Sequence, residues 1–379
     1  MPLCPSAVGG EWIHRIPADS RSLGPPTGEE PDFGTVRPPP PRLRSASMTA
    51  LTVQAIEPSE AELSSFIQEV PHANVFQTPE MVATYRRTKG CRACVLGVIG
   101  TRGALQASLV SVVFRDAPAV AHASIRGGPL CRPDEGEAAR FLLTAHENRV
   151  QGTTLYSRIY PLSGEECSHE VASACGFERT PWLNYLIPLE DLDAQWALLS
   201  RSRQKGIRKA ERSGVVLRDV KTKADLDALV SILRETARRG RFPMQHPSLF
   251  AAAKEVLAER GMARFVLADI GGAVAAARVM LAYGGVLYDW YAGSDPAFHS
   301  MRCDEWLIWE LVKWGHARGM KVLDFGGAGI PGESYGPAEF KRQFNGIPVE
   351  WGRYTRVHHP RALRFAESMQ HILAGSGSP

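Results

Sequence analysis

The stretch RFVLADIGGAVAAARVMLAYGGVL, from Arg264 to Leu287, decides the fold. Two apolar runs flank the pair Gly271-Gly272, a pattern typical of a β-hairpin with a tight turn. The stretch CVLGVIGTRGALQASLVSVVF, from Cys94 to Phe114, shows the same pattern about 170 residues earlier, with its turn at 101–103. A hairpin that recurs at a fixed offset indicates one structural unit present in two copies.

The ends of the two copies also correspond. HEVASACGFERTPWLNYLIPL (169–189) and PAEFKRQFNGIPVEWGRYTRV (337–357) both read as a helix, a turn and a strand, and Phe177 aligns with Phe344. Each copy then consists of a hairpin, a further strand, a helix, a strand, a closing helix and a closing strand. We therefore expect an α/β protein built from two tandem domains.

The domain boundaries follow from these copies. We expect the first domain at 48–187 and the second, which carries the active site, at 188–357. A helix at about 360–374 is expected to pack back on the first domain. Residues 1–47 are rich in Pro, Gly, Ser and Arg, and we expect a disordered tail there. Met48 follows directly and is a candidate for the natural first residue.

The composition is that of an ordinary soluble protein. A net charge of +4 is too small by itself to indicate nucleic-acid binding. The seven cysteines are scattered, and the lone CxxC of Cys91 and Cys94 has no second pair or histidine at zinc spacing, so we expect reduced thiols and no metal. No apolar run has the length of a membrane span and no signal peptide is readable. We expect a cytoplasmic protein that can meet a membrane-bound substrate at the inner face of the membrane.

The second copy has the features of an active site. A strand at 286–291 leads to a helix from Asp304 to Arg318, with Asp304 as its expected N-cap and Gly319 as its stop. MKVLDFGG (320–327) then reads as a strand that ends in two glycines. Because α/β folds bind anions and acyl carriers where a strand opens onto a loop and a helix N-terminus, we place the active site here.

The two strand ends in this copy carry candidate residues. Strict alternation predicts that Tyr288 and Trp290 lie on one face of the first strand. It sends Asp289 and Tyr291 to the other face. Asp324 ends the second strand. Each of the two aspartates is either a structural carboxylate or a candidate general base.

The densest basic segment is SRSRQKGIRKAERSG, which reads as a helix over 200–214. Its cations repel one another and those in its first turn oppose the helix dipole, so a bound phosphate would offset both costs. The alternative is a solvated basic face. The cations expected on one face are Arg201, Lys205, Arg208 and Arg212. A further cluster with the same two interpretations is Arg234, Arg238, Arg239 and Arg241.

The segment FKRQF (340–344) contains a lysine that the fold does not explain. Helical spacing places Phe340 and Phe344 on one apolar face, where packing accounts for them. The matching helix of the first copy has no lysine near the position of Lys341. A shared fold therefore does not require Lys341, which leaves it available for chemistry, whereas we expect Arg342 to be a surface charge.

Several segments resemble, in this order, the Fem-type (FemABX) aminoacyltransferases. They are PHANVFQTPEMVATYRRTKG (71–90), RQKGIRKAERSGV (203–215), ETARRGRF (235–242), WYAGSDPAFHSMRCDEWLIWELVKWGHARGMKVLDFGG (290–327) and FKRQF. Members of this family have two GNAT-like acyltransferase domains. They move an amino acid from aminoacyl-tRNA to an amine, typically on a lipid-linked peptidoglycan precursor. The resemblance covers most of residues 70–357.

The resemblance implies roles for individual residues. The family's aromatic-lysine pair falls on Phe340 and Lys341, with the lysine at the reacting carbonyl. Its basic linker helix, implicated in phosphate binding, and its aromatic strand end imply the substrate-binding residues Arg203, Lys205, Arg208, Tyr288 and Tyr291. The resemblance implies no metal and no cofactor beyond the co-substrate, aminoacyl-tRNA.

The chain departs from the family pattern in two places. Ser248–Gly261 is too short for the long coiled-coil arm, thought to hold tRNA, that many members insert in the second domain. Cys303-Asp304-Glu305 stands where the family has a polar Asn-Tyr start to the helix. The resemblance therefore does not imply the usual pocket chemistry.

The leading hypothesis is transfer of an aminoacyl group from tRNA to an amine of a cell-wall precursor or a small peptide-like metabolite. The amine attacks directly and Lys341 stabilises the oxyanion, with Asp289, Asp324 or the donor's ribose hydroxyl as the base. One alternative is an acyl-CoA-dependent N-acyltransferase of polysaccharide or natural-product synthesis, whose donor pyrophosphate docks before Asp304. Another is a non-catalytic binder of phosphorylated lipid or RNA that uses the basic helix. The acyl group, the acceptor and the oligomeric state stay open.

Overall fold

The computed structural model describes residues 55–100, 103–117, 120–132, 136–163, 168–333 and 336–375, with side chains as far as 368. The predicted tail at 1–47, Met48 and two residues of the first hairpin turn, 101–102, lie outside the described residues.

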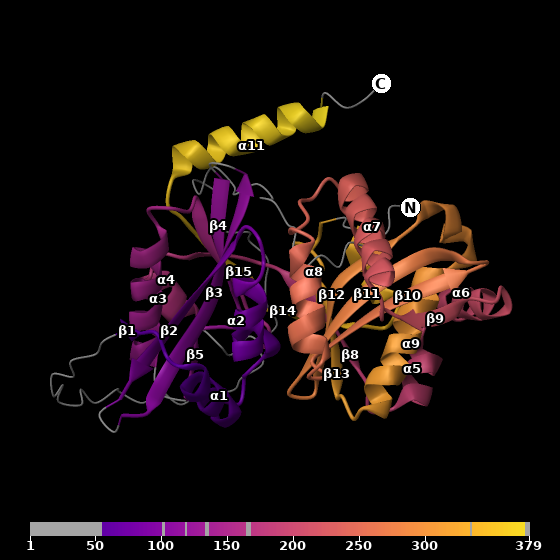
Figure 1. Ribbon diagram of the computed structural model, residues 1–379, viewed down its shortest axis with the longest axis horizontal. Coiled ribbons are helices and arrows are strands. Elements are labelled where there is room, and N and C mark those ends of the chain that lie inside the picture. Colours follow the sequence, from indigo (N-terminus) through magenta and orange to yellow (C-terminus); the bar gives the residue numbers. More distant parts are fainter. Residues whose placement is uncertain are drawn as a thin grey trace, which may run out of the picture.

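Two mixed β-sheets form the centres of the two halves (Figure 1). The described strands of the first sheet are β1 (Ala55–Ile56), β2 (Cys91–Ile99), β3 (Leu105–Ala117), β4 (Val120–Arg126), β5 (Leu130–Cys131), β6 (Tyr156–Tyr160), β7 (Glu178–Thr180) and β15 (Arg353–Val357). Those of the second sheet are β8 (Leu183–Pro188), β9 (Val216–Asp219), β10 (Ala263–Ile270), β11 (Ala273–Tyr283), β12 (Val286–Ser294), β13 (Val322–Gly327) and β14 (Ile347–Glu350).

Helices cover both sheets. Those of the first half are α1 (Glu60–Glu69), η1 (Val75–Gln77), α2 (Pro79–Arg86), α3 (Gly136–Val150) and α4 (His169–Ala174). Those of the second half are α5 (Leu192–Leu198), α6 (Arg201–Arg212), α7 (Lys223–Gly240), α8 (Ser248–Ala253), η2 (Lys254–Ala258), η3 (Pro296–Met301), α9 (Cys303–Ala317) and α10 (Gly336–Arg342). The C-terminal helix α11 (Pro360–Gly375) packs on the first half through Leu363, which contacts Leu155 and Tyr156.

The strand orders confirm the predicted repeat. The first sheet runs β1-β2-β3-β4-β6-β15-β7, with β5 beside β3, and the second runs β14-β8-β13-β12-β11-β10-β9. In each half an antiparallel hairpin and a third strand are followed by a helix and a parallel strand, so β2, β3, β4 and β6 correspond to β10, β11, β12 and β13.

The two halves exchange their last strands. β8 follows the first unit in the chain but inserts between β13 and β14 of the second sheet, whereas β15 follows the second unit and inserts between β6 and β7 of the first. The predicted boundary between residues 187 and 188 therefore does not divide the two sheets. Each closing strand forms its hydrogen bonds with strands of the other half. This exchange, which pattern alone does not reveal, ties the halves together.

Local signals explain several element ends. Ser59 and Glu62 form a capping box at the start of α1, as the SxxE pattern of 59–62 favours, and Thr78 caps α2 ahead of Pro79. Gly319 follows α9 with a φ of 71°, as its predicted role as a stop requires. The prediction of Asp304 as N-cap of α9 is wrong. Arg302 takes that position with a φ of 61°, because Asp304 lies inside the helix and its carboxylate binds another residue.

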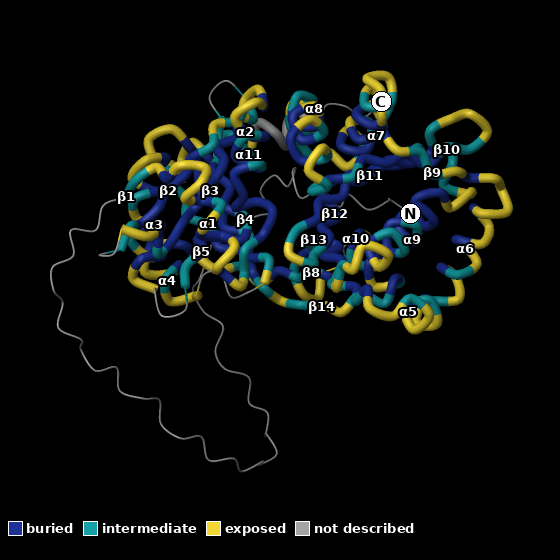
Figure 2. The backbone as a smooth tube through the Cα atoms, turned by 60° about the horizontal axis from the view of Figure 1, so that its bottom comes forward, coloured by how far each residue is buried: buried dark blue, intermediate teal, exposed yellow. Residues whose placement is uncertain are grey.

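Apolar clusters fill both faces of the second sheet, and Figure 2 shows much of β11 and β12 in the dark blue of buried residues. One cluster lies under α6, α9 and α10 and includes Phe325, Phe340 and Phe344. The other lies under α7 and α8 and continues into Phe76 and Phe114 of the first half. The halves therefore share a continuous apolar core, which fixes the first half against the second.

The prediction of strict alternation along β12 is wrong at Tyr291. The register between β11 and β12 shifts between Val279 and Met280, which face Tyr291 and Asp289. As a result both Trp290 and Tyr291 pack on the same apolar side, with the Phe250 ring 4.8 Å from that of Tyr291. A bulge of this kind adds one residue to a strand and so reverses the facing of the residues beyond it.

The segment between α7 and β10 is the place where many Fem-type proteins insert the coiled-coil arm. Between α7 and β10, a stretch that is described without gaps, the chain forms only the short helices α8 and η2, so the coiled-coil arm is absent there, as predicted. Within the described residues, no helix has both the length and the apolar character needed to cross a bilayer.

Candidate functional site

The parallel strands β12 and β13 separate at the candidate site. Within the described chain their pairing ends at Tyr288 and Asp324. Beyond these residues β12 continues beside β11 as far as Ser294, whereas β13 leads to Gly326, whose φ is 76°, and Gly327. Because β13 stays paired with β8 as far as Gly327, the two strands part while both remain in the sheet.

A buried lysine lies at the end of β13. Lys341 of α10 is fully buried, and its Nζ donates to the carbonyl oxygen of Gly327 at 2.5 Å. Asp324 accepts hydrogen bonds from the Gly326 amide at 2.8 Å and from Asn184 Nδ2 at 3.3 Å. Burial raises the pKa of Asp324 to about 6, although the Gly326 amide and the Lys341 charge act in the opposite direction. A lysine and a carboxyl that titrates near neutrality therefore stand together.

An arginine that the sequence analysis missed joins this place to α9. Arg278 of β11 is fully buried and donates to Asp289 Oδ2 at 2.5 Å and to Asp304 Oδ1 at 2.8 Å. The centres of the guanidinium and of the Lys341 ammonium lie 6.0 and 5.8 Å from the ring centre of Phe325. The two buried cations thus lie near the same aromatic ring. A lone arginine inside the apolar run AVAAARVMLAY was the signal that sequence reasoning overlooked.

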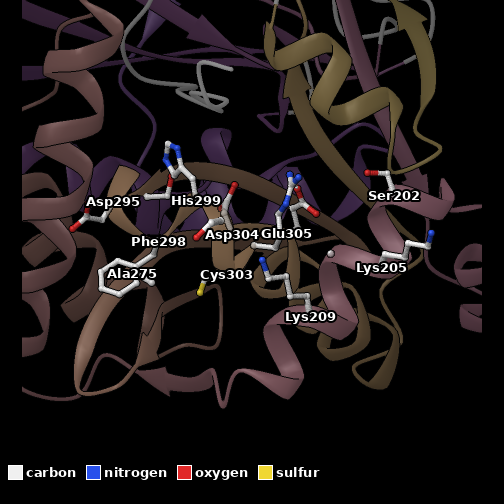
Figure 3. Close-up of a pocket in the computed structure, with 14 residues that line it drawn as sticks. Ser202, Lys205, Lys209, Ala275, Asp295, Phe298, His299, Cys303, Asp304 and Glu305 are labelled. Atoms are coloured by element: carbon white, nitrogen blue, oxygen red, sulfur yellow. The ribbon is translucent and has the colours of Figure 1, made fainter.

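A pocket opens at the N-terminus of α9. It has a volume of about 640 Å³ and is lined by residues of α6, β12, η3 and α9. In Figure 3, Lys205 and Lys209 lie on one side, Asp295 and His299 on the other, and Asp304 and Glu305 between them. Asp304 lines this pocket and also accepts from Arg278, so it links the pocket to the buried pair of Arg278 and Asp289.

The second acid of the pocket, Glu305, has two arginine partners. Arg302 Nη1 donates to its Oε1 at 2.8 Å, and the buried Arg203 of α6 forms an ion pair with the same oxygen. At the floor of the pocket, the carboxylates of Asp304 and Glu305 are thus paired with arginines. At its rim stand Lys205 and Lys209, for which no acidic partner is found among the described residues.

The structure separates the three basic residues that were expected to bind phosphate. Arg203 points inward and is buried. Lys205 is exposed and lines the pocket. Arg208 is exposed beside Trp196, with 5.3 Å from its guanidinium to the ring centre. The cations predicted to share one face of α6 are all exposed, and they are Arg201, Lys205, Arg208 and Arg212; Lys209 is exposed as well.

The other predicted residues divide between site and core. Lys341, Asp324 and Asp289 meet near the end of β13. Phe340 packs against Phe325 and Phe344, as its spacing predicts. Tyr288 and Tyr291 are buried in the apolar core that the halves share. Arg342 is exposed and paired with Glu339, and among the cluster of α7 Arg238 pairs with Glu235.

Metal ligands were not expected from the sequence. Among the described residues, no group of three or more His, Cys, Asp or Glu side chains is arranged to hold a metal ion. Cys91 and Cys94 are both free thiols.

Comparisons with known proteins identify the fold. Residues 200–342 match a family described as acetyltransferase (GNAT) domain. That stretch is therefore similar to a GNAT domain. The crystal structure of FemX aligns with 82% of this chain and 99% of its own at a TM-score of 0.63 and 14% identity. A tandem GNAT protein from the clavulanic acid biosynthesis pathway aligns with 81% of this chain and 98% of its own, at a TM-score of 0.55 and 13% identity.

A third structure extends the set. The C-terminal domain of a putative lysylphosphatidylglycerol synthetase from Agrobacterium fabrum aligns with 83% of this chain and 98% of its own, at a TM-score of 0.52 and 12% identity. No curated protein sequence matches significantly. The chain therefore has two tandem GNAT-like domains, and the predicted resemblance to Fem-type proteins is confirmed at the level of the fold. The GNAT match supports an acyl-group transferase and does not distinguish aminoacyl from acyl-CoA donors.

Proposed function

We propose that this protein transfers an aminoacyl group from aminoacyl-tRNA to the amine of an acceptor. The observation that carries the proposal is the fully buried Lys341, placed beside Asp324 where β12 and β13 separate. An ammonium has three donor hydrogens, and Gly327 takes one of them. The lysine can therefore donate to an acyl oxygen brought to this strand end.

The reaction in this proposal is a direct acyl transfer. The acceptor nitrogen attacks the ester carbonyl, and the tetrahedral oxyanion forms beside the Lys341 ammonium in a setting of low dielectric. Asp324, with a pKa of about 6, accepts a proton from the nitrogen. The ester C–O bond then breaks, the amide remains, and the ribose oxygen of the tRNA leaves with the proton that Asp324 accepted. No covalent enzyme intermediate is required.

The first turn of α9 favours this donor over acyl-CoA. A helix N-terminus is suited to a pyrophosphate, but here Asp304 and Glu305 occupy that turn and both are buried. These carboxylates already pair with Arg278 and Arg203, so the two buried arginines are not available to a diphosphate. The fold shared with FemX and with the synthetase domain adds support, since the resemblance of the sequence to Fem-type proteins already implies aminoacyl transfer.

An acyl-CoA donor is the second candidate. Lys205, Lys209 and Arg302 line the same pocket and supply the positive charge that a pyrophosphate needs. A non-catalytic binder of phosphorylated lipid or RNA would rely on the exposed face of α6 alone. For the acceptor we propose an amine on a cell-wall or lipid precursor at the inner face of the membrane, or on a small peptide-like metabolite.

The test is incubation of the full chain with mixed charged tRNA, an acyl-CoA pool and candidate amines, with products read by mass spectrometry. Aminoacylated products that disappear after RNase treatment support the proposal. Products that survive RNase and require acyl-CoA replace it with the second candidate. Steeply salt-dependent RNA or lipid binding without any product replaces it with the binding protein.

A further inference from the structure

Arg203 touches two parts of the second half at once. Its side chain lies on the inward face of α6 and is buried. On one side it forms an ion pair with Glu305 at the floor of the pocket. On the other side its guanidinium lies 4.3 Å from the ring centre of Phe340 and 5.0 Å from that of Phe344. A single side chain thus spans from the pocket to the helix that carries Lys341.

The contact with the pocket is closely packed. A Cβ atom added to Gly206, one turn after Arg203, would lie 2.2 Å from Glu305 Oε2. Glu305 is therefore enclosed between the α6 backbone, Arg203 and Arg302. A buried carboxylate is costly unless a cation is paired with it. The ion pair with Glu305 therefore holds the Arg203 guanidinium in place.

The contact with α10 reaches the lysine through its neighbour. Phe340 precedes Lys341, and its ring packs against Phe325 and Phe344 at centroid distances of 6.0 and 5.2 Å. The guanidinium lies over these rings, an arrangement in which a flat cation attracts an aromatic face. Arg203 Nε has no hydrogen-bond partner among the described residues, so the ion pair and the rings hold the group.

We propose that Arg203 is a positioning residue, which sets the helix of Lys341 against the pocket through Glu305 and Phe340. This replaces the role as a phosphate ligand that the family resemblance implied, because a buried side chain with these partners does not reach a phosphate in the pocket. The inference rests on the proposed function only for its effect on turnover. The placement of Lys341 is testable without any substrate.

The first experiment measures the exposure of Lys341 by reductive methylation of the full chain with formaldehyde and a borane, read by mass spectrometry. The exposed Lys205 and Lys209 react in every variant and serve as internal standards. In the wild-type chain Lys341 is protected. In Arg203→Met its rate of labelling rises about tenfold or more, because α10 loses the contact that fixes it.

Two variants control for the fold. Arg201→Met removes an exposed arginine from the same turn of α6 and leaves Lys341 protected. Glu147→Gln perturbs the buried network of the first half and also leaves Lys341 protected, even if it lowers the midpoint of thermal unfolding as much as Arg203→Met does. Exposure of Lys341 in Glu147→Gln as well would reduce the role of Arg203 to general stability and overturn the proposal.

The second experiment uses the donor and acceptor found in the pool assay. Arg203→Met lowers kcat by about tenfold to a hundredfold with little change in KM, because a displaced reacting group slows the transfer without weakening binding. A raised KM with unchanged kcat would show that Arg203 binds substrate phosphate and would overturn the proposal. If no pair of substrates reacts, the proposed function fails while the labelling result still decides the position of Lys341.

Discussion

The first half buries the carboxylate of Glu147 and the second half buries that of Asp324, and their surroundings shift the two pKa values in opposite directions. In the first half, Glu147 of α3 bonds to His146 Nδ1 at 2.8 Å and to His358 Nε2 at 2.7 Å. Burial alone would raise its pKa, but these hydrogen bonds outweigh burial and hold the pKa at about 2. In the second half, burial prevails at Asp324 and raises the pKa to about 6.

This difference in pKa matches the separate roles that the proposed function gives to the two halves. Glu147 stays charged at every ordinary pH, and through His358 it joins α3 to the segment after β15, which comes from the other end of the chain. Asp324 changes its protonation near neutrality beside a lysine, as a group that moves protons must do. In the proposed function, the buried acid of the first half is structural and the buried acid of the second half accepts a proton.

A second contrast concerns the backbone between the hairpin and the third strand. In the first half, Gln77 fills this place: its side chain bonds to both the amide and the carbonyl of Val110, at 2.8 and 2.9 Å, and to the carbonyl of Arg126 at 2.7 Å. In the second half the corresponding strands carry the bulge opposite Val279, and the pocket opens near their ends. In the second half a pocket therefore opens where the first half has the side chain of Gln77 between its strands.

The largest expected effect distinguishes the two closing helices. Lys341→Met lowers the rate of transfer by about 10² to 10³, the usual loss when one oxyanion donor is removed, while circular dichroism and the unfolding midpoint stay near those of the wild type. Ala174→Met, at the matching position of α4, leaves the rate unchanged. A near-normal rate in Lys341→Met would remove the lysine from the mechanism.

The two carboxylates give opposite dependences of stability on pH. A raised folded-state pKa stabilises below the unfolded value, so Asp324 costs about 3 kcal/mol as the pH rises from about 4 to 6. A lowered folded-state pKa stabilises above the unfolded value, so Glu147 loses about 3 kcal/mol of stabilisation as the pH falls from about 4.5 to 2. Urea unfolding at a series of pH values measures both.

Two variants assign these slopes. Asp324→Asn removes the loss between pH 4 and 6, and Glu147→Gln removes the loss below pH 4.5, each without affecting the other. If the loss of stability between pH 4 and 6 persists in Asp324→Asn, Asp324 does not titrate in that range and the contrast between the halves is lost.

A smaller effect is expected at a close approach of backbone and side chain. Gly206→Ala places a methyl group against Glu305 Oε2, which its two arginine partners hold in place, and we expect a net loss of about 1 to 2 kcal/mol. Gly152→Ala in the first half meets nothing within 4 Å and should change the free energy of unfolding by less than about 0.5 kcal/mol. Equal effects in both variants would argue against tight packing of α6 on α9.

The sequence by itself determined the repeat and most of its elements. The two hairpins, the capping box at Ser59 and the glycine stop at Gly319 all depend on contacts between residues close in the chain, which residue type and spacing encode. The basic face of α6 and the packing of Phe340 and Phe344 follow from helical period for the same reason.

Only the tertiary structure decided which strand joins which sheet and which charges meet. The exchange of β8 and β15 and the bulge opposite Val279 depend on pairing between distant segments. Local periodicity carries no information about such pairing. The meeting of Arg278 with Asp289 and Asp304, and of Arg203 with Glu305 and Phe340, likewise joins distant elements. Spacing identified Lys341 as a residue that the fold does not need, but its place beside Asp324 depends on how α10 packs against the end of β13.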